Sequence, residues 1–137
     1  MGVTIGNKEK SLDCGYAGFN ILRTHIAGLI SKEFKTFYNE PGIFAKTQEY
    51  WDNYDRKLYE VMVPKYHIEE GVLKFLFLPD CDGKLSYQAC KQLWNLIKDD
   101  DNDFLFGYVG RSDCAKYSEF KEIVKMCAKN RWVLRWY

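Results

Sequence analysis

The hydrophobic pattern that begins at Phe19 constrains the fold of this chain more than any other feature of its sequence. Large apolar residues recur there at helical spacing, with polar residues between them: Phe19, Leu22, Ile26, Leu29 and Ile30. Such a stripe is typical of a helix that buries one face and exposes the other. Gly15 precedes the pattern and releases the chain from an extended segment into this helix. The sequence therefore predicts a protein built around an amphipathic helix.

Three other stretches show the same helical period. We expect a second helix over residues 46–62, which Pro64 should end because proline disrupts a helix interior. A third helix over residues 86–98 should begin at Ser86, and a last one over residues 118–130 at Ser118, since serine is a common N-cap residue. Residues 69–77 fit either a short buried helix or a strand, and we favour the helix.

Shorter segments have the character of strands. Residues 3–5 and 11–14 can pair around a turn, and the tail 131–137 alternates between apolar and polar residues as a half-buried strand does. The segment that begins at Phe104 also has strand character. The sequence therefore predicts one globular domain, residues 1–137, with a mainly helical α+β fold. Its small antiparallel sheet should contain the N-terminal strands, the Phe104 segment and the C-terminal strand.

Charge, cysteine content and apolar runs argue against several classes of protein. The formal net charge of +1 is too small for nonspecific nucleic-acid binding and for the acidic surface of a DNA mimic. The five cysteines show no Cys-x-x-Cys spacing, so free thiols in a reducing compartment fit better than a disulfide framework or a zinc ribbon. The most apolar stretch, residues 72–78, is far shorter than the roughly 20 residues of a membrane span. We therefore expect a cytoplasmic protein without a membrane segment.

The most specific motif is Leu-Pro-Asp-Cys-Asp-Gly-Lys-Leu-Ser at residues 78–86, which matches half of a calcium loop. Asp80 and Asp82 fall at two ligand positions of that loop, and Gly83 falls at its glycine position. The positions of the first carboxylate and of the bidentate glutamate hold leucine and alanine, so two strong ligands are missing. We therefore expect a turn in which both aspartates bond backbone amides and Gly83 adopts positive φ. Calcium binding at Asp80 and Asp82 is the alternative.

Four aspartates crowd the end of the third predicted helix, at positions 99, 100, 101 and 103. The helix dipole disfavours negative charge there, so another role should explain them. An ordinary solvated loop is one interpretation. An acidic knob, with Asp100 and Asp101 meeting a basic partner protein, is a second. A third is a cation site that these residues complete together with Asp80 and Asp82.

Few residues suit catalysis. The two histidines are His25 and His67, and Cys14 with His25 is the first pair of thiol and base to consider. These two residues lie about three helical turns apart, so they cannot bond directly within one straight helix. A basic stripe on the last helix is interspersed with acidic residues, and we interpret it as a solvated face. An enzyme is therefore the weaker interpretation, and nucleic acid is not the expected partner.

Aromatic residues between positions 34 and 59 exceed what one helical stripe can bury. We expect some of them to lie on the surface and to bind a partner protein, with Tyr50, Trp51 and Tyr54 as candidates. The alternative is that they cover the edge of a small core.

Residues 75–86, together with Cys90, resemble a motif of an uncharacterised family of small bacterial and phage-borne proteins. That family usually has an acidic residue after the glycine of the motif, where this chain has Lys84, which argues against a metal role. The resemblance implies a bacterial or mobile-element origin, and the family has no known activity. It includes a second element, Tyr-x-Gly-Phe with a following Arg, matched here by Tyr16, Gly18, Phe19 and Arg23.

These observations together predict a small non-enzymatic protein that binds another protein, of an immunity or counter-defence type. A cation-dependent or thiol-dependent enzyme of unknown substrate is the alternative. No cofactor is expected, apart from the alternative of calcium.

Overall fold

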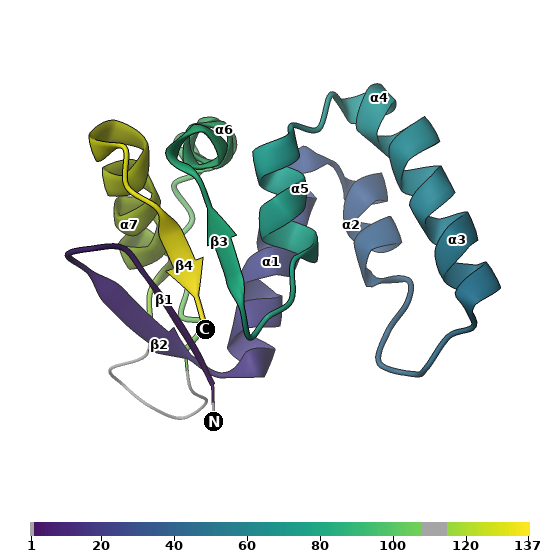
Figure 1. Cartoon of the computed structure of the whole chain (residues 1–137), viewed down its shortest axis with the longest axis horizontal. Helices are drawn as coiled ribbons and strands as arrows, with labels where there is room; N and C mark the ends of the chain where they lie inside the picture. Colours follow the sequence, from purple (N-terminus) through teal and green to yellow (C-terminus); the bar gives the residue numbers. More distant parts are fainter. Residues whose placement is uncertain (1, 108–114) are drawn as a thin grey trace.

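Helices pack on one face of a small antiparallel sheet in the computed structural model, which describes residues 2–107 and 115–137 (Figure 1). The predicted α+β class with mainly helical content is confirmed. The strands lie in the order β2-β1-β4-β3, and all neighbours are antiparallel. Their bounds are β1 (Val3–Gly6), β2 (Ser11–Cys14), β3 (Gly83–Leu85) and β4 (Leu134–Trp136).

The helices follow the predicted hydrophobic periods, with one addition. Helices α6 and α7 match the predictions for residues 86–98 and 118–130, and α5 confirms the favoured helix at residues 69–77. Helix α2 was not predicted; it begins after Ser31, whose hydroxyl accepts the N–H of Phe34 at 2.9 Å. The bounds are α1 (Tyr16–Ile30), α2 (Lys32–Asn39), α3 (Gln48–Lys57), a π-helical turn η1 (Leu58–Met62), α4 (Val63–Tyr66), α5 (Glu70–Phe77), α6 (Tyr87–Ile97) and α7 (Tyr117–Asn130).

The fourth strand of the sheet is not the predicted one. The described part of the Phe104 segment makes only an isolated bridge, from Leu105 to Lys116, and residues 108 and 109 lie outside the described residues. Strand β3 takes its place in the sheet and pairs with β4. A strand of three residues is too short to show the alternation by which strands are predicted.

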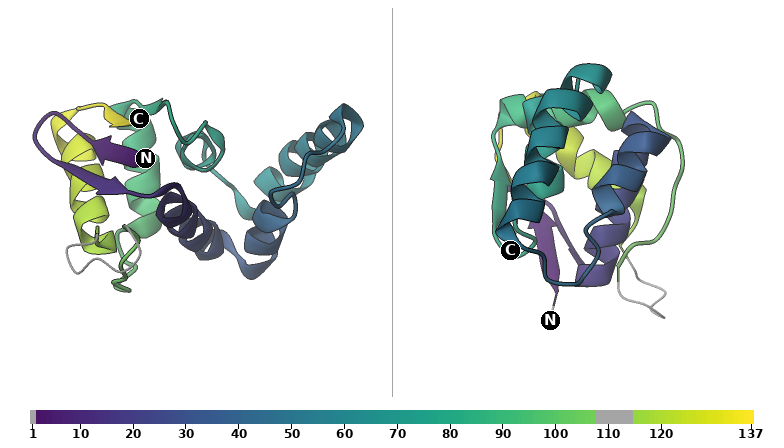
Figure 2. Two further views of the ribbon diagram at one scale, coloured as in Figure 1. Left: turned by 90° about the horizontal axis from the view of Figure 1, so that it is seen from below. Right: turned by 90° about the vertical axis from the view of Figure 1, so that its right-hand side faces the viewer.

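The core lies where α1, α5, α6 and α7 cover one face of the sheet (Figures 1 and 2). Trp136 is fully buried at its centre, with its ring centroid 5.4 Å from that of Phe75 and 6.1 Å from that of Phe19. A Cβ at position 83 would lie 2.0 Å from the Trp136 ring, so only glycine fits there. Gly83 therefore makes room for Trp136, and the positive φ that we predicted for it is wrong.

Helices α2 to α4 project from this body as an arm, residues 32–66 (Figure 2). Helix α3 continues through η1 into α4, so the predicted stop at Pro64 is wrong. Pro64 lies in the first turn of α4, directly after the π-helical turn, where the regular α-helical bonding is already interrupted. The helix ends instead at His67, which adopts a left-handed conformation with φ of 52°.

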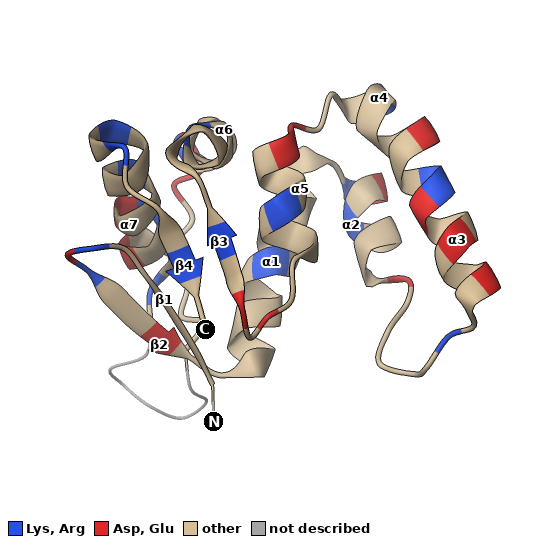
Figure 3. Cartoon of the chain, viewed as in Figure 1, with Lys and Arg blue, Asp and Glu red and all other residues tan. Residues whose placement is uncertain are grey.

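The outer face of the sheet carries polar side chains, including the Lys and Arg positions of β3 and β4 (Figure 3). Within the two described ranges, no helix combines the length and the apolar character that crossing a membrane requires.

Candidate functional site

His25 and Asp100 form a hydrogen-bonded pair that joins α1 to the loop after α6. The distance from His25 Nε2 to Asp100 Oδ2 is 2.6 Å, and the Asp100 side chain is only 6% exposed. The imidazole packs against Phe104 and Tyr117, with ring centroids at 4.6 and 5.0 Å. Sequence analysis missed the pair because the two residues lie 75 positions apart and no local pattern connects them.

Asp100 is held through both carboxylate oxygens. Its Oδ1 accepts the side-chain amide of Asn102 at 2.6 Å, and the Tyr117 hydroxyl is buried nearby without a well-aligned hydrogen bond among the described residues. Burial alone would raise the pKa of Asp100, but interactions with His25, Tyr117 and Asn102 lower it to about 2. The carboxylate is therefore ionised at neutral pH. In a neutral imidazole it holds the proton on Nε2, which leaves Nδ1 as the acceptor.

Two of the four aspartates after α6, Asp100 and Asp103, bind neighbouring elements through their side chains. Lys121 Nζ donates to the backbone carbonyls of Asp100 and Lys98, at 2.5 and 3.4 Å, and so brings a cation to the C-terminus of α6. Asp103 accepts the N–H and the hydroxyl of Ser118, at 3.1 and 3.3 Å, in the first turn of α7. Ser118 is therefore not the N-cap that we predicted; a carboxylate from a distant loop binds this helix start.

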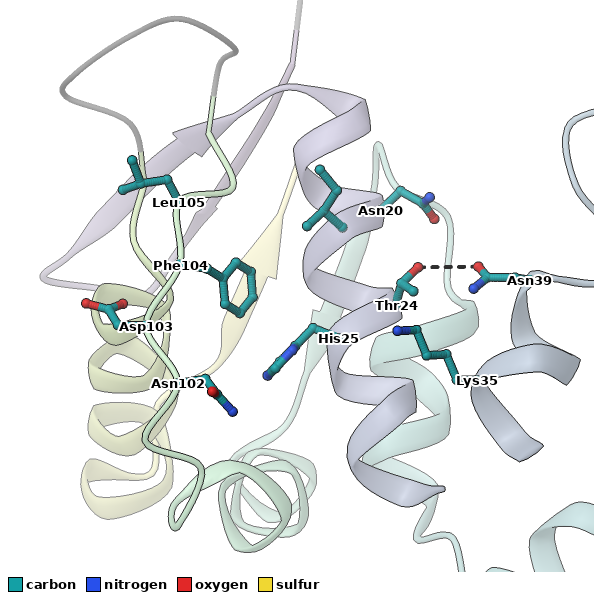
Figure 4. Close-up of a pocket in the computed structure, with 10 residues that line it drawn as sticks. Asn20, Thr24, His25, Lys35, Asn39, Asn102, Asp103, Phe104 and Leu105 are labelled. Atoms are coloured by element: carbon teal, nitrogen blue, oxygen red, sulfur yellow. Dashed lines mark hydrogen bonds between the residues drawn. The ribbon is translucent and has the colours of Figure 1, made fainter. Parts of the chain in front are cut away.

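A pocket of about 730 Å³ opens beside His25, between α1, α2 and residues 102–105 (Figure 4). Amides of Asn20, Asn39 and Asn102 line it, together with the Lys35 ammonium group and the Phe104 ring. These groups can hydrogen-bond a small polar molecule, and His25 can exchange a proton with it.

The predicted calcium ligands lie apart from the second group of aspartates. Asp80 and Asp82 are exposed on the turn before β3, and Asp101 is exposed after α6. Within residues 2–107 and 115–137, no three His, Cys, Asp or Glu side chains gather to hold a metal ion. The two aspartate groups are thus not brought together into one such site. Calcium binding at Asp80 and Asp82 stays a prediction.

Arg23 connects the two sequence elements on which the family resemblance rests. It is only 8% exposed, and its Nη2 donates to the backbone carbonyl of Leu78 at 2.6 Å. The guanidinium group also lies 4.3 Å from the centroid of the Phe19 ring. Burial lowers the pKa of Arg23, while Tyr38 and Asp80 act to raise it. The turn at residues 78–82 therefore supplies a backbone acceptor to a buried cation, and Asp80 acts on that cation through its charge.

The four thiols that the structure describes differ in their exposure. Cys14, Cys90 and Cys127 are buried, whereas Cys81 is exposed on the turn before β3. Cys114 lies outside the described residues. His25, which the sequence suggested considering with Cys14, is bonded to Asp100.

The predicted aromatic residues lie on the arm, in α3. Tyr54 is buried; its ring stacks on Phe37 with centroids 4.2 Å apart, and its hydroxyl donates to the Phe37 carbonyl at 2.9 Å. Tyr50 is half-buried, and Trp51 is exposed with its ring centroid 5.7 Å from that of Tyr54. Tyr54 therefore supports its neighbours from inside the arm, and Trp51 faces solvent.

The arm also holds the two most exposed apolar side chains among the described residues. Of the eleven large apolar residues that are exposed in the described chain, five lie between positions 43 and 61. Ile43 is 95% exposed and Phe44 is 79% exposed, so neither is used by the core. The aromatic excess in the sequence pointed to this region but not to its aliphatic members. We call these residues the arm surface: Ile43, Phe44, Trp51, Tyr59 and Val61.

Comparisons of the chain with models of known protein families, with curated proteins and with solved structures found no match.

Proposed function

We propose that this chain is a protein-binding module whose partner docks on the arm surface. The observation that carries the proposal is the exposure of Ile43 and Phe44 on a segment that also exposes Trp51, Tyr59 and Val61. Apolar area left in water forgoes about 25 cal/mol per Å² of burial free energy, which a docking partner recovers. Aromatic residues are also the most frequent anchors of protein interfaces.

Hydrogen bonds hold two helices of the arm together, which gives a docking element a fixed shape. Lys65 Nζ and the Tyr66 hydroxyl both donate to Glu33 Oε1, at 2.8 and 2.5 Å, and so tie α4 back to α2. The π-helical turn lies between these bonds and α3, and such turns occur frequently at functional sites. These bonds fix α4 relative to α2, which limits the conformational entropy that the helices of the arm lose on binding.

Only one of the two aspartates that we predicted to meet a basic partner is available for such a contact. Asp100 is engaged by His25, so Asp101 is the exposed member of that pair. In this proposal Asp101 tunes the rate of association with a basic partner, and the arm surface supplies the affinity. The family resemblance supports a bacterial or mobile-element setting, in which the module blocks a target protein as an immunity or counter-defence factor.

Quantitative affinity capture from bacterial lysate tests the proposal. Phe44→Ser with Tyr59→Ser removes two members of the arm surface, and Ile21→Ser with Leu105→Ser is the matched control. Ile21 and Leu105 are 52% and 53% exposed, but they lie outside the arm. We expect wild type and control to retain a stoichiometric partner that the arm variant loses. Absence of such a partner, or its equal retention by the arm variant, would contradict the proposal.

A second candidate is an enzyme that uses His25 as a general acid or base. The bond from His25 to Asp100 and the adjacent pocket favour it, because an oriented imidazole beside a polar pocket suits proton transfer. Hydrolysis of p-nitrophenyl esters or phosphates that disappears in His25→Ala, with the fold retained, would support this candidate. Equal rates in both proteins would remove it.

A further inference from the structure

Two cations face each other on the outer face of the sheet. Lys84 in β3 lies directly opposite Arg135 in β4, and Gly6 in β1 lies on the other side of Arg135. Leu85, Leu134 and Trp136 point into the core, so Lys84 and Arg135 point outward and both are exposed. Residues that are directly opposite in antiparallel strands have Cβ atoms about 5 Å apart. The register therefore places two positive charges side by side in solvent (Figure 3).

These two charges are not neutralised within the described residues. Neither Lys84 nor Arg135 forms an ion pair or a side-chain hydrogen bond there; the ion pairs are His25–Asp100, Lys65–Glu33 and Lys74–Glu70. Like charges directly opposite in a sheet are destabilising. The nearest acidic strand residue, Asp13 on β2, accepts the Thr4 hydroxyl at 2.7 Å. The pair is thus an unfavourable arrangement for folding that an anionic ligand would make favourable.

A hollow of about 410 Å³ adjoins this pair and mixes cations with aromatic rings. Lys8, Arg131 and Arg135 line it together with Trp132 and Tyr137. Tyr137 is 64% exposed, and Lys8 Nζ lies 5.7 Å from the centroid of the Trp132 ring. An exposed ring on a cationic sheet face is suited to stacking on a nucleobase, and the cations are suited to the phosphates on either side of it.

We infer that the outer sheet face binds single-stranded nucleic acid over a few nucleotides, independently of the arm surface. Lys84, Arg135 and Arg131 contact backbone phosphates, and Tyr137 stacks on a base. Unpaired bases fit this surface better than a duplex, because the exposed ring needs a free base face on which to stack. An acidic peptide would use the cations but not the rings. The net charge of +1 did not indicate this surface, because its cations lie far apart in the sequence and come together only in the fold.

Fluorescence anisotropy with fluorescein-labelled 12-nucleotide RNA and DNA of mixed sequence tests the inference. We expect saturable binding in 50 mM salt, weaker binding to the matching duplex, and a log–log salt slope of about −2 for the three phosphate contacts. Lys84→Glu should weaken binding at least tenfold, and Tyr137→Leu at least fivefold. Lys57→Glu on the arm should change it less than twofold.

Lys84→Glu also distinguishes a loss of binding from a loss of folding stability. It places a carboxylate opposite Arg135, so its thermal unfolding temperature should equal or exceed that of wild type while its affinity falls. The inference would be overturned if no saturable binding were measured at protein concentrations up to about 100 μM. This concentration is roughly the weak limit of nonspecific affinity. Equal binding of a 12-residue glutamate peptide, preference for anionic vesicles, or an unchanged affinity in Tyr137→Leu would overturn it as well.

Discussion

Replacing Asp100 with asparagine measures how strongly the buried carboxylate fixes His25 and the loop after α6. Asparagine keeps the shape and an acceptor oxygen for His25 Nε2, but it removes the charge. The pKa of Asp100 falls from its ordinary value of 3.8 to about 2, and the side chain is only 6% exposed. Each pKa unit is worth about 1.4 kcal/mol, so the ionised form stabilises the native state by about 2 kcal/mol at neutral pH.

The pH dependence follows from the direction of this change. The pKa is lower in the folded protein than in the unfolded chain, so the stabilisation is complete above about pH 5 and disappears as the pH falls from about 4 to about 2. Urea unfolding followed by tryptophan fluorescence at pH 7, 5, 4 and 3 measures it. The difference between wild type and Asp100→Asn should be about 2 kcal/mol at pH 7 and should shrink at pH 3.

Asp101→Asn is the matched control. Asp101 is the exposed neighbour of Asp100, and its side chain makes no hydrogen bond or ion pair within the described residues. Its replacement should change stability by less than about 0.5 kcal/mol at any of these pH values. A loss below about 0.5 kcal/mol in Asp100→Asn at pH 7, or a loss that does not depend on pH, would refute the assignment of a buried, ionised Asp100.

Three further substitutions test other parts of the structure. Gly83→Ala should destabilise the protein by about 3 kcal/mol or more in urea unfolding, because its Cβ would lie 2.0 Å from the Trp136 ring; near-wild-type stability would show that the ring lies elsewhere. Asp103→Ala should cost about 1 kcal/mol and increase amide exchange at Ser118, and unchanged exchange would contradict the bond from this loop to α7. Tyr54→Phe should cost about 1 kcal/mol because it removes the buried hydrogen bond from the Tyr54 hydroxyl to the Phe37 carbonyl, and an unchanged melting temperature would count against that bond.

The helices could be predicted because each carries its own hydrophobic period. Helix α1 buries Phe19, Leu22 and Ile26, which are the residues that made it visible in the sequence. The Ser86 cap was also predictable, since its hydroxyl accepts the Ala89 N–H through a local motif. Signals of this kind depend only on residues within a few positions of one another.

Features that depend on distant partners could not be predicted. Strand β3 exists because β4 pairs with it, and Gly83 is required because Trp136 lies against it. The pairing of His25 with Asp100 likewise joins segments that only the fold brings together. The continuation of the helix past Pro64 depends on a π-helical turn that no local residue pattern announces. The candidate sites are therefore the part of this protein that the sequence could least reveal.

Photo-crosslinking in bacterial cells is the most direct test of the central claim, that the arm surface binds a protein. A photoreactive phenylalanine analogue such as benzoylphenylalanine is placed at position 44, on the arm, or at position 21, which is also exposed but lies on α1. The account predicts a discrete protein adduct from position 44 and none from position 21. No adduct from position 44, or the same adduct from both positions, would contradict it.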